Sequence, residues 1–158
     1  METNRVRHKE QRERAKTDPA QIYWRALVER VHATPDGFSR LPEAEKKYYA
    51  ACCVDGETYN GGLQQFFENQ SGACYREALA GLEDMGATFT LELMKRAKQI
   101  LFAFRDVPED TAERRRLLSN TASPSREARM GELDTLFCED PDGLAERIQQ
   151  FAREQKLF

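Results

Sequence analysis

Apolar residues recur at helical spacing along most of the chain, and no segment has the strict alternation of a β-strand. Tyr23, Leu27 and Val31 follow one another at four-residue intervals, which predicts an amphipathic helix that begins at Asp18, as its N-cap, with Pro19 in its first turn. The longest pattern covers residues 88–104, where apolar positions from Phe89 to Phe104 keep to one helical face. The periodicity therefore predicts an all-α protein.

Turn residues divide this pattern into further helices. A second helix is expected from Pro42 to Asp55 and Gly56, because glycine suits the left-handed end of a helix. A short helix is then expected to begin at Asn60, acting as its N-cap, and to end at residues 71–72. Later helices are expected over residues 74–85, around 114–118, and on both sides of residues 140–141. We expect a single compact domain of seven or eight helices, and its predicted core residues are Phe66, Phe67, Leu82, Leu93, Ile100, Leu101 and Phe137.

The first 17 residues differ from the rest of the chain. They hold six Lys or Arg and three Glu, and Val6 is the only large apolar residue between Glu2 and Thr17. Little can drive the packing of such a segment. We therefore expect residues 1–17 to form a charged, flexible tail and residues 18–158 to form one helical domain, as the length of 158 residues also favours.

Charge and cysteine content narrow the class of protein. The four cysteines form no Cys-x-x-Cys pair, and the two histidines, His8 and His32, favour neither a metal centre nor a catalytic imidazole. No apolar run approaches the roughly 20 residues of a membrane helix, and the amino-terminal residues lack the apolar stretch of a signal peptide. We expect a cytoplasmic protein whose cysteines are reduced and mostly packed. We also expect that it has no cofactor or metal and is not an enzyme.

The most distinctive segment is residues 57–72, which read ETYNGGLQQFFENQSG. Asn60, Gly61 and Gly62 at a helix start would present backbone amides to an anion, although the Lys and Ser/Thr of a phosphate loop are missing. Asn60, Gln64 and Glu68 lie four residues apart, so they predict one polar helix face. A small-ligand, anion-binding or enzymatic site there is one hypothesis. We favour a structural role for this segment. The glycines would allow a neighbouring helix to approach closely, and the Asn60 side chain would cap the helix that begins there.

This segment and its continuation resemble a bacterial helical family of mostly uncharacterised proteins that includes a DNA-mimic protein. The resemblance covers roughly residues 41–151 and lies in YNGGLQQFFENQSG, in residues 78–79 and 86–87, and in LDTLF at residues 133–137. It implies an all-helical, cytoplasmic, non-enzymatic protein. The mimic member blocks a DNA-binding protein by placing carboxylates where phosphates would lie, and it acts as a dimer. The family-motif residues, which we expect to be structural, are Asn60, Gly61, Gly62, Gln65, Phe66, Phe67 and Asn69.

Mimicry requires a dense array of carboxylates, because duplex DNA carries one negative charge per ~1.7 Å of its axis. The acidic residues here fall into spaced groups with arginines close by, so an ordinary solvated surface is the alternative interpretation. One such spaced pair is Glu127 and Asp134, with Gly131 between them. The candidate partner-binding residues are Glu77, Glu83, Asp84, Glu139, Asp140, Asp142 and Glu146.

The function we favour from the sequence is a non-enzymatic protein-binding module that inhibits a DNA-binding protein through an acidic surface. An immunity-type protein that neutralises a toxin is a second hypothesis, and the ligand or enzymatic face of Asn60, Gln64 and Glu68 is a third. The expected partner is a protein, and neither direct nucleic-acid binding nor membrane binding is expected. The resemblance also leaves a homodimer open.

Overall fold

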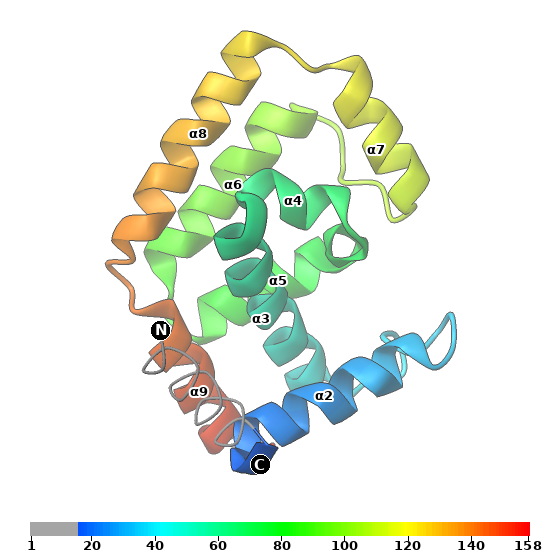
Figure 1. Ribbon diagram of the computed structural model, residues 1–158, viewed down its shortest axis with the longest axis vertical. Helices are drawn as coiled ribbons and strands as arrows, with labels where there is room; N and C mark the ends of the chain where they lie inside the picture. Colours follow the sequence, from blue (N-terminus) through cyan, green and yellow to red (C-terminus); the bar gives the residue numbers. More distant parts are fainter. Residues whose placement is uncertain (1–15) are drawn as a thin grey trace, which may run out of the picture.

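The computed structural model describes residues 16–158, so residues 1–15 of the expected tail lie outside the described residues. All regular secondary structure in the described part is helical, which confirms the predicted all-α fold (Figure 1). The elements in chain order are α2 (Pro19–His32), α3 (Glu43–Gly61), α4 (Leu63–Glu68), the 3-10 helix η1 (Gln70–Cys74), α5 (Tyr75–Asp84), α6 (Thr88–Phe102), α7 (Thr111–Asn120), α8 (Pro124–Glu139) and α9 (Leu144–Glu154).

Helix α3 lies at the centre of the fold and contacts α4, η1, α5, α8 and α9. Helices α6 and α8 run side by side, and α7 lies at the opposite end of the molecule from α2 and α9 (Figure 1). Of the predicted core residues, Ile100 is only half-buried, because it lies at the margin of the core rather than within it. The others are buried, namely Phe66, Phe67, Leu82, Leu93, Leu101 and Phe137.

Helix α3 does not end at Asp55 and Gly56, so that prediction is wrong. The helix continues through Gly56 to Gly61, with Val54 and Thr58 buried on either side of the glycine. Their burial outweighs the propensity cost of a helical glycine, which is about 1 kcal/mol. The left-handed glycine is instead Gly62, with φ of +88°, whose N–H donates to the Thr58 carbonyl.

Helix α6 ends earlier than its apolar pattern predicts. Ala103 adopts a φ of +52° and terminates the helix, so Phe104 leaves the apolar face and is 95 % exposed. Phe102 takes the last buried position, with its ring centroid 5.6 Å from that of Phe67. The Lys98 ammonium donates to the Ala103 carbonyl, which is favourable at the negative end of a helix.

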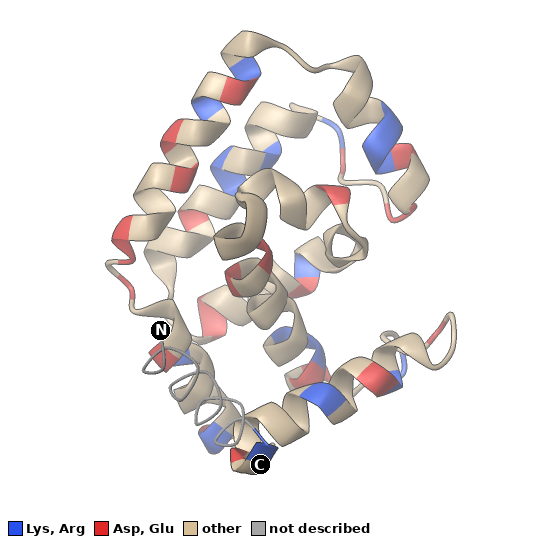
Figure 2. Cartoon of the chain, in the orientation of Figure 1, with Lys and Arg blue, Asp and Glu red and all other residues tan. Residues whose placement is uncertain are grey.

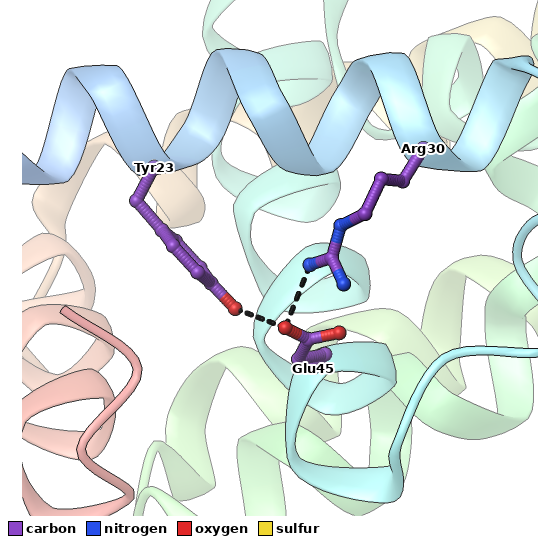
Figure 3. Close-up of polar contacts among 3 residues, drawn as sticks. All are labelled: Tyr23, Arg30 and Glu45. Atoms are coloured by element: carbon purple, nitrogen blue, oxygen red, sulfur yellow. Dashed lines mark hydrogen bonds and ion pairs between the residues drawn. The ribbon is translucent and has the colours of Figure 1, made fainter.

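Side chains rather than close backbone packing attach α2 to α3. The Trp24 ring stacks on Tyr49 with centroids 5.4 Å apart. The Tyr23 hydroxyl and the Arg30 guanidinium both donate to Oε1 of Glu45, each at 2.6 Å (Figure 3). Burial alone would raise the pKa of Glu45, but these two donors outweigh burial and hold that pKa below its ordinary value. Glu45 therefore joins the two helices as a charged group.

Two helical glycines provide a matched test of this packing. A Cβ added at Gly81 would lie 2.8 Å from the Lys47 carbonyl oxygen, whereas one added at Gly56 would meet no atom within 4 Å. Gly81→Ala is expected to lower the free energy of unfolding by about 1–3 kcal/mol, because α5 must move away from α3. Gly56→Ala is expected to raise it by about 0.5–1 kcal/mol, because alanine favours the helix. Urea unfolding followed by circular dichroism measures both values, and destabilisation by Gly56→Ala would contradict an uninterrupted α3.

Candidate functional site

The family-motif residues form the corner between α3 and α4. Phe66 and Phe67 anchor this corner in the core, with ring centroids 5.3 Å apart and both side chains fully buried. Asn60 is exposed in the last turn of α3, so its prediction as the N-cap of α4 is wrong. It consequently does not share a helix with Gln64 and Glu68, and the predicted single polar face is wrong as well. The cause is the continuation of α3, which leaves Gly62 at the turn.

A carboxylate from α8 occupies the start of α4. Oδ1 of Asp134 accepts a hydrogen bond from the Leu63 backbone N–H at 2.8 Å, across 71 residues of sequence. A Cβ at Gly62 would lie 2.5 Å from Oδ2 of the same carboxylate. Glycine is therefore needed at position 62 both for its backbone conformation and for this close approach. The amide that an external anion would have to bind already has an internal carboxylate partner.

The polar side chains of the motif bind one another around this corner. The side-chain amides of Gln65 and Asn69 both donate to Oε2 of Glu57, at 2.6 Å and 2.9 Å. Gln64 donates to Glu68 within α4. Two cavities in the described residues, of about 510 Å³ and about 350 Å³, are lined by other side chains. This geometry ties the motif residues to the corner rather than to a ligand pocket.

Three of the four cysteines are packed: Cys74 is buried and Cys52 and Cys53 are half-buried, whereas Cys138 is exposed. Burial raises the pKa of Cys52, and a hydrogen bond with Cys53, followed by burial, raises that of Cys74, so both thiols are protonated at neutral pH. Within residues 16–158, no cluster of three or more His, Cys, Asp or Glu is placed to hold a metal ion. No helix in that same range has the length and apolar character needed to cross a bilayer.

The candidate partner-binding residues fall into two groups. The first group, Glu77, Glu83 and Asp84, lies on α5. Asp84 forms an ion pair with Lys47, at 2.6 Å between Oδ2 and Nζ. Glu77 is half-buried, and Glu83 is exposed. The charge of the α5 group is thus partly compensated within the protein.

The second group lies where α8 passes into α9. Figure 2 shows acidic residues recurring along α8 to this junction, while the basic positions of α8 lie near its start. Residues 130–146 contain six Asp or Glu and no Lys or Arg. Two of the four candidates here, Asp140 and Asp142, accept hydrogen bonds from helix starts: Asp140 from the Leu144 N–H at 3.0 Å, and Asp142 from the Thr90 N–H at 2.8 Å. Glu139 and Glu146 are exposed.

Arg147 separates the two groups. Its guanidinium donates to the Asp142 carbonyl at 2.7 Å and to the Met85 carbonyl at 3.1 Å, so a positive charge lies between α5 and the start of α9. Asp84 and Arg147 line the same cavity. The structure therefore does not merge the seven candidates into one uninterrupted acidic surface.

Asp55 on α3 joins the second group, although its position in the sequence did not mark it as a candidate. Burial, followed by the negative charges of Asp140 and Glu146, raises the pKa of Asp55. Among the described residues, its carboxylate has no hydrogen bond or ion pair. No local signal in the sequence marked Asp55, because the charges that act on it come from residues 140 and 146, far along the chain. We name the surface formed by Asp55, Glu139, Asp140, Asp142 and Glu146 the acidic junction.

The capping role of Asp134 can be tested by substitution. Asp134→Ala removes the partner of the Leu63 N–H and is expected to lower the free energy of unfolding by about 1–2 kcal/mol, as loss of a helix cap does. Glu132→Ala is the matched control on the same helix, because Glu132 is exposed, and its effect is expected within about 0.5 kcal/mol. Thermal and urea unfolding of both variants give the comparison. An equal loss of unfolding free energy in the two variants would contradict the capping role of Asp134.

Asp55 predicts a specific pH dependence of stability. Because its pKa is raised in the folded state, the folded protein binds more protons than the unfolded chain between the ordinary pKa and the raised one. Ionised Asp55 thus costs stability above its raised pKa, and this cost disappears as the pH falls below the ordinary pKa of an aspartate. Asp55→Asn is expected to melt at a higher temperature than the natural protein at pH 7, with the difference vanishing near pH 3. A lower melting temperature of Asp55→Asn at pH 7 would contradict this assignment.

Comparison with known proteins places the fold and the motif in a family. Neither the curated proteins nor the solved structures contain a match to this chain. The family model described as DMP19-like protein matches residues 39–155, which are most of the chain and include every helix from α3 to α9. Helix α2 precedes the matched residues. The resemblance to a DNA-mimic family is thereby confirmed, and the chain belongs to the DMP19-like family, which is of the DNA-mimic type.

Proposed function

We propose that this protein binds another protein through the acidic junction, and that its partner is a DNA-binding protein which it inhibits by competing with DNA. The observation that carries the proposal is uncompensated negative charge where α3, α8 and α9 meet. Asp55 has no cationic partner among the described residues, and the charges of Asp140 and Glu146 add to its own field. A surface of this kind attracts proteins whose exposed groups are Lys and Arg.

Hydrogen bonds from the backbone hold two carboxylates of the acidic junction in fixed positions, so a partner would recognise their geometry as well as their charge. Asp140 and Asp142 each accept hydrogen bonds from backbone amides of helix starts, which fix their carboxylates. Fixed groups lose less conformational freedom when a partner binds, so more of the interaction energy appears as affinity. Glu139 and Glu146, which are exposed, would act mainly by accelerating association.

The α5 group is a weaker candidate for the contact surface. Lys47 neutralises Asp84, and Arg147 lies between this group and the acidic junction. A cationic partner would therefore encounter both positive and negative charges around α5. The proposed interface is therefore centred on the junction of α8 and α9. We also propose that the protein is not an enzyme, because the DMP19-like family is generally non-enzymatic. A cytoplasmic location and a homodimer belong to the same proposal.

Affinity capture tests this function and identifies the partner in the same experiment. The full chain, immobilised at low ionic strength, is expected to retain a DNA-binding protein from an extract of its own cells, and duplex DNA is expected to elute that protein. The double substitution of Glu139 and Glu146 to Gln is expected to weaken the captured complex about ten-fold or more, chiefly through a slower association rate. Surface plasmon resonance at several salt concentrations measures the rate constants.

The matched control substitutes Glu109 and Glu113 to Gln. Both are exposed acidic residues at the end of the molecule opposite α9: Glu109 precedes α7, and Glu113 lies in its first turn. The net charge therefore changes equally in the two double variants. This control is expected to leave the affinity within about two-fold, because screening limits charge effects over distances beyond ~8–10 Å. Equal weakening by both pairs would argue for non-specific attraction, and capture of no DNA-eluted protein would oppose the proposed function.

A further inference from the structure

A surface cavity of about 350 Å³ opens next to the acidic junction, between α2, α3 and α9. Its walls combine two kinds of chemistry. Trp24, Tyr48 and Ile148 supply aromatic and aliphatic surface, and Asp55 supplies a carboxylate. The volume lies at the lower end of the range typical of sites that enclose a small group.

Among the described residues 16–158, no Lys or Arg side chain lines this cavity. The half-buried Asp55 carboxylate lacks a hydrogen bond or ion pair within the described part of the chain, and Asp140 and Glu146 reinforce its negative field. An ionised carboxylate removed from water without a partner is unfavourable, and a cation that enters the cavity relieves that cost. The chemistry of the walls therefore matches a group with an apolar stem and a positive end.

We propose that this cavity binds a long cationic side chain, arginine or lysine, from the protein partner. The aliphatic stem would lie against Trp24, Tyr48 and Ile148, while the charged end pairs with Asp55. Lys and Arg side chains combine these two properties, because their methylene stems cover apolar surface while their ends remain charged. This inference rests on the proposed function. It adds one inserted side chain as a specific anchor, next to the acidic junction, which otherwise attracts the partner through its negative charge.

The cavity would make partner recognition more selective than attraction between opposite charges alone. Trp24 belongs to α2, which lies outside residues 39–155 matched by the family model. Asp55, Tyr48 and Ile148 lie within them. The anchor site is thus assembled from the family core and from a helix added in front of it. Central buried anchors contribute more to binding energy than charges at the rim of an interface.

The chain contains one tryptophan, so the fluorescence of Trp24 reports directly on this cavity. The probe is a twelve-residue peptide of alternating Arg and Gly, and the control peptide has citrulline, a neutral analogue, in place of each Arg. The arginine peptide is expected to change Trp24 emission saturably, and the citrulline peptide is not. A matching peptide of Lys and Gly shows which cation the cavity prefers.

Two variants of the full chain distinguish binding inside the cavity from attraction by the surrounding negative charges. Asp55→Asn removes the charge, and Gly56→Leu adds a neutral side chain at a position that lines the cavity, where a Cβ meets no atom within 4 Å. Each is expected to weaken binding of the arginine peptide about ten-fold, whereas Glu109→Gln stays within about two-fold. Circular dichroism verifies that each variant is folded, and if Asp55→Asn does not fold, Gly56→Leu tests the cavity alone.

The outcomes distinguish this inference from the function on which it rests. Fluorescence anisotropy detects peptide binding independently of Trp24. If the Glu139 and Glu146 double substitution weakens this binding and both cavity variants leave it unchanged, the cavity is overturned, while binding through the carboxylates of α8 and α9 still stands. Binding that leaves Trp24 emission unchanged would also overturn the cavity. Absence of any saturable binding of the arginine peptide would count against the cavity and the acidic junction together.

Discussion

The fold depends on satisfying the backbone polar groups at the corner where α3, α4 and η1 meet. Each helix end frees amides or carbonyls that are costly to bury without partners. Asp134 takes the Leu63 N–H, and the fully buried Arg114 donates to the carbonyls of Phe67 and Asn69 at 2.8 Å and 2.7 Å. Burial lowers the pKa of Arg114, but an arginine remains charged in proteins. A Cβ at Gly72 would lie 2.5 Å from Arg114 Nε, so this glycine makes room for the guanidinium.

The same requirement separates the carboxylates into two kinds. Asp134, Asp140 and Asp142 accept hydrogen bonds from backbone amides at helix starts, so their positions are set by the fold. Asp55 and Glu146 have no such partner within the described residues. Composition alone treats these residues as equal negative charges. Capped carboxylates hold a fixed geometry, whereas unpaired ones retain a field that a cation can neutralise.

Periodicity was sufficient to predict the helical class, the start of α2 at Asp18 and most of the core. It failed where a distant residue decides a local structure. Gly56 is a helix terminator by its intrinsic preference, yet contacts of α3 with several helices carry the helix through it. The capping of α4 by Asp134 depends on a residue 71 positions away, and nothing in the local sequence distinguishes buried Arg114 from exposed Arg115. Asp55 was missed for the same reason, since its neighbours come from α8 and α9.

Helix α2 completes the cavity beside the acidic junction, which residues 39–155 of the family match do not form by themselves. Its attachment relies on Trp24 stacked on Tyr49 and on Glu45, which accepts hydrogen bonds from Tyr23 and Arg30. Trp24 also lines the cavity that contains Asp55. A side chain bound in that cavity would contact α2 and α3 together, so its binding energy would also stabilise the attachment of α2 to the core. By the same linkage, whatever loosens the Glu45 contacts would weaken the anchor site while leaving the carboxylates of α8 and α9 in place.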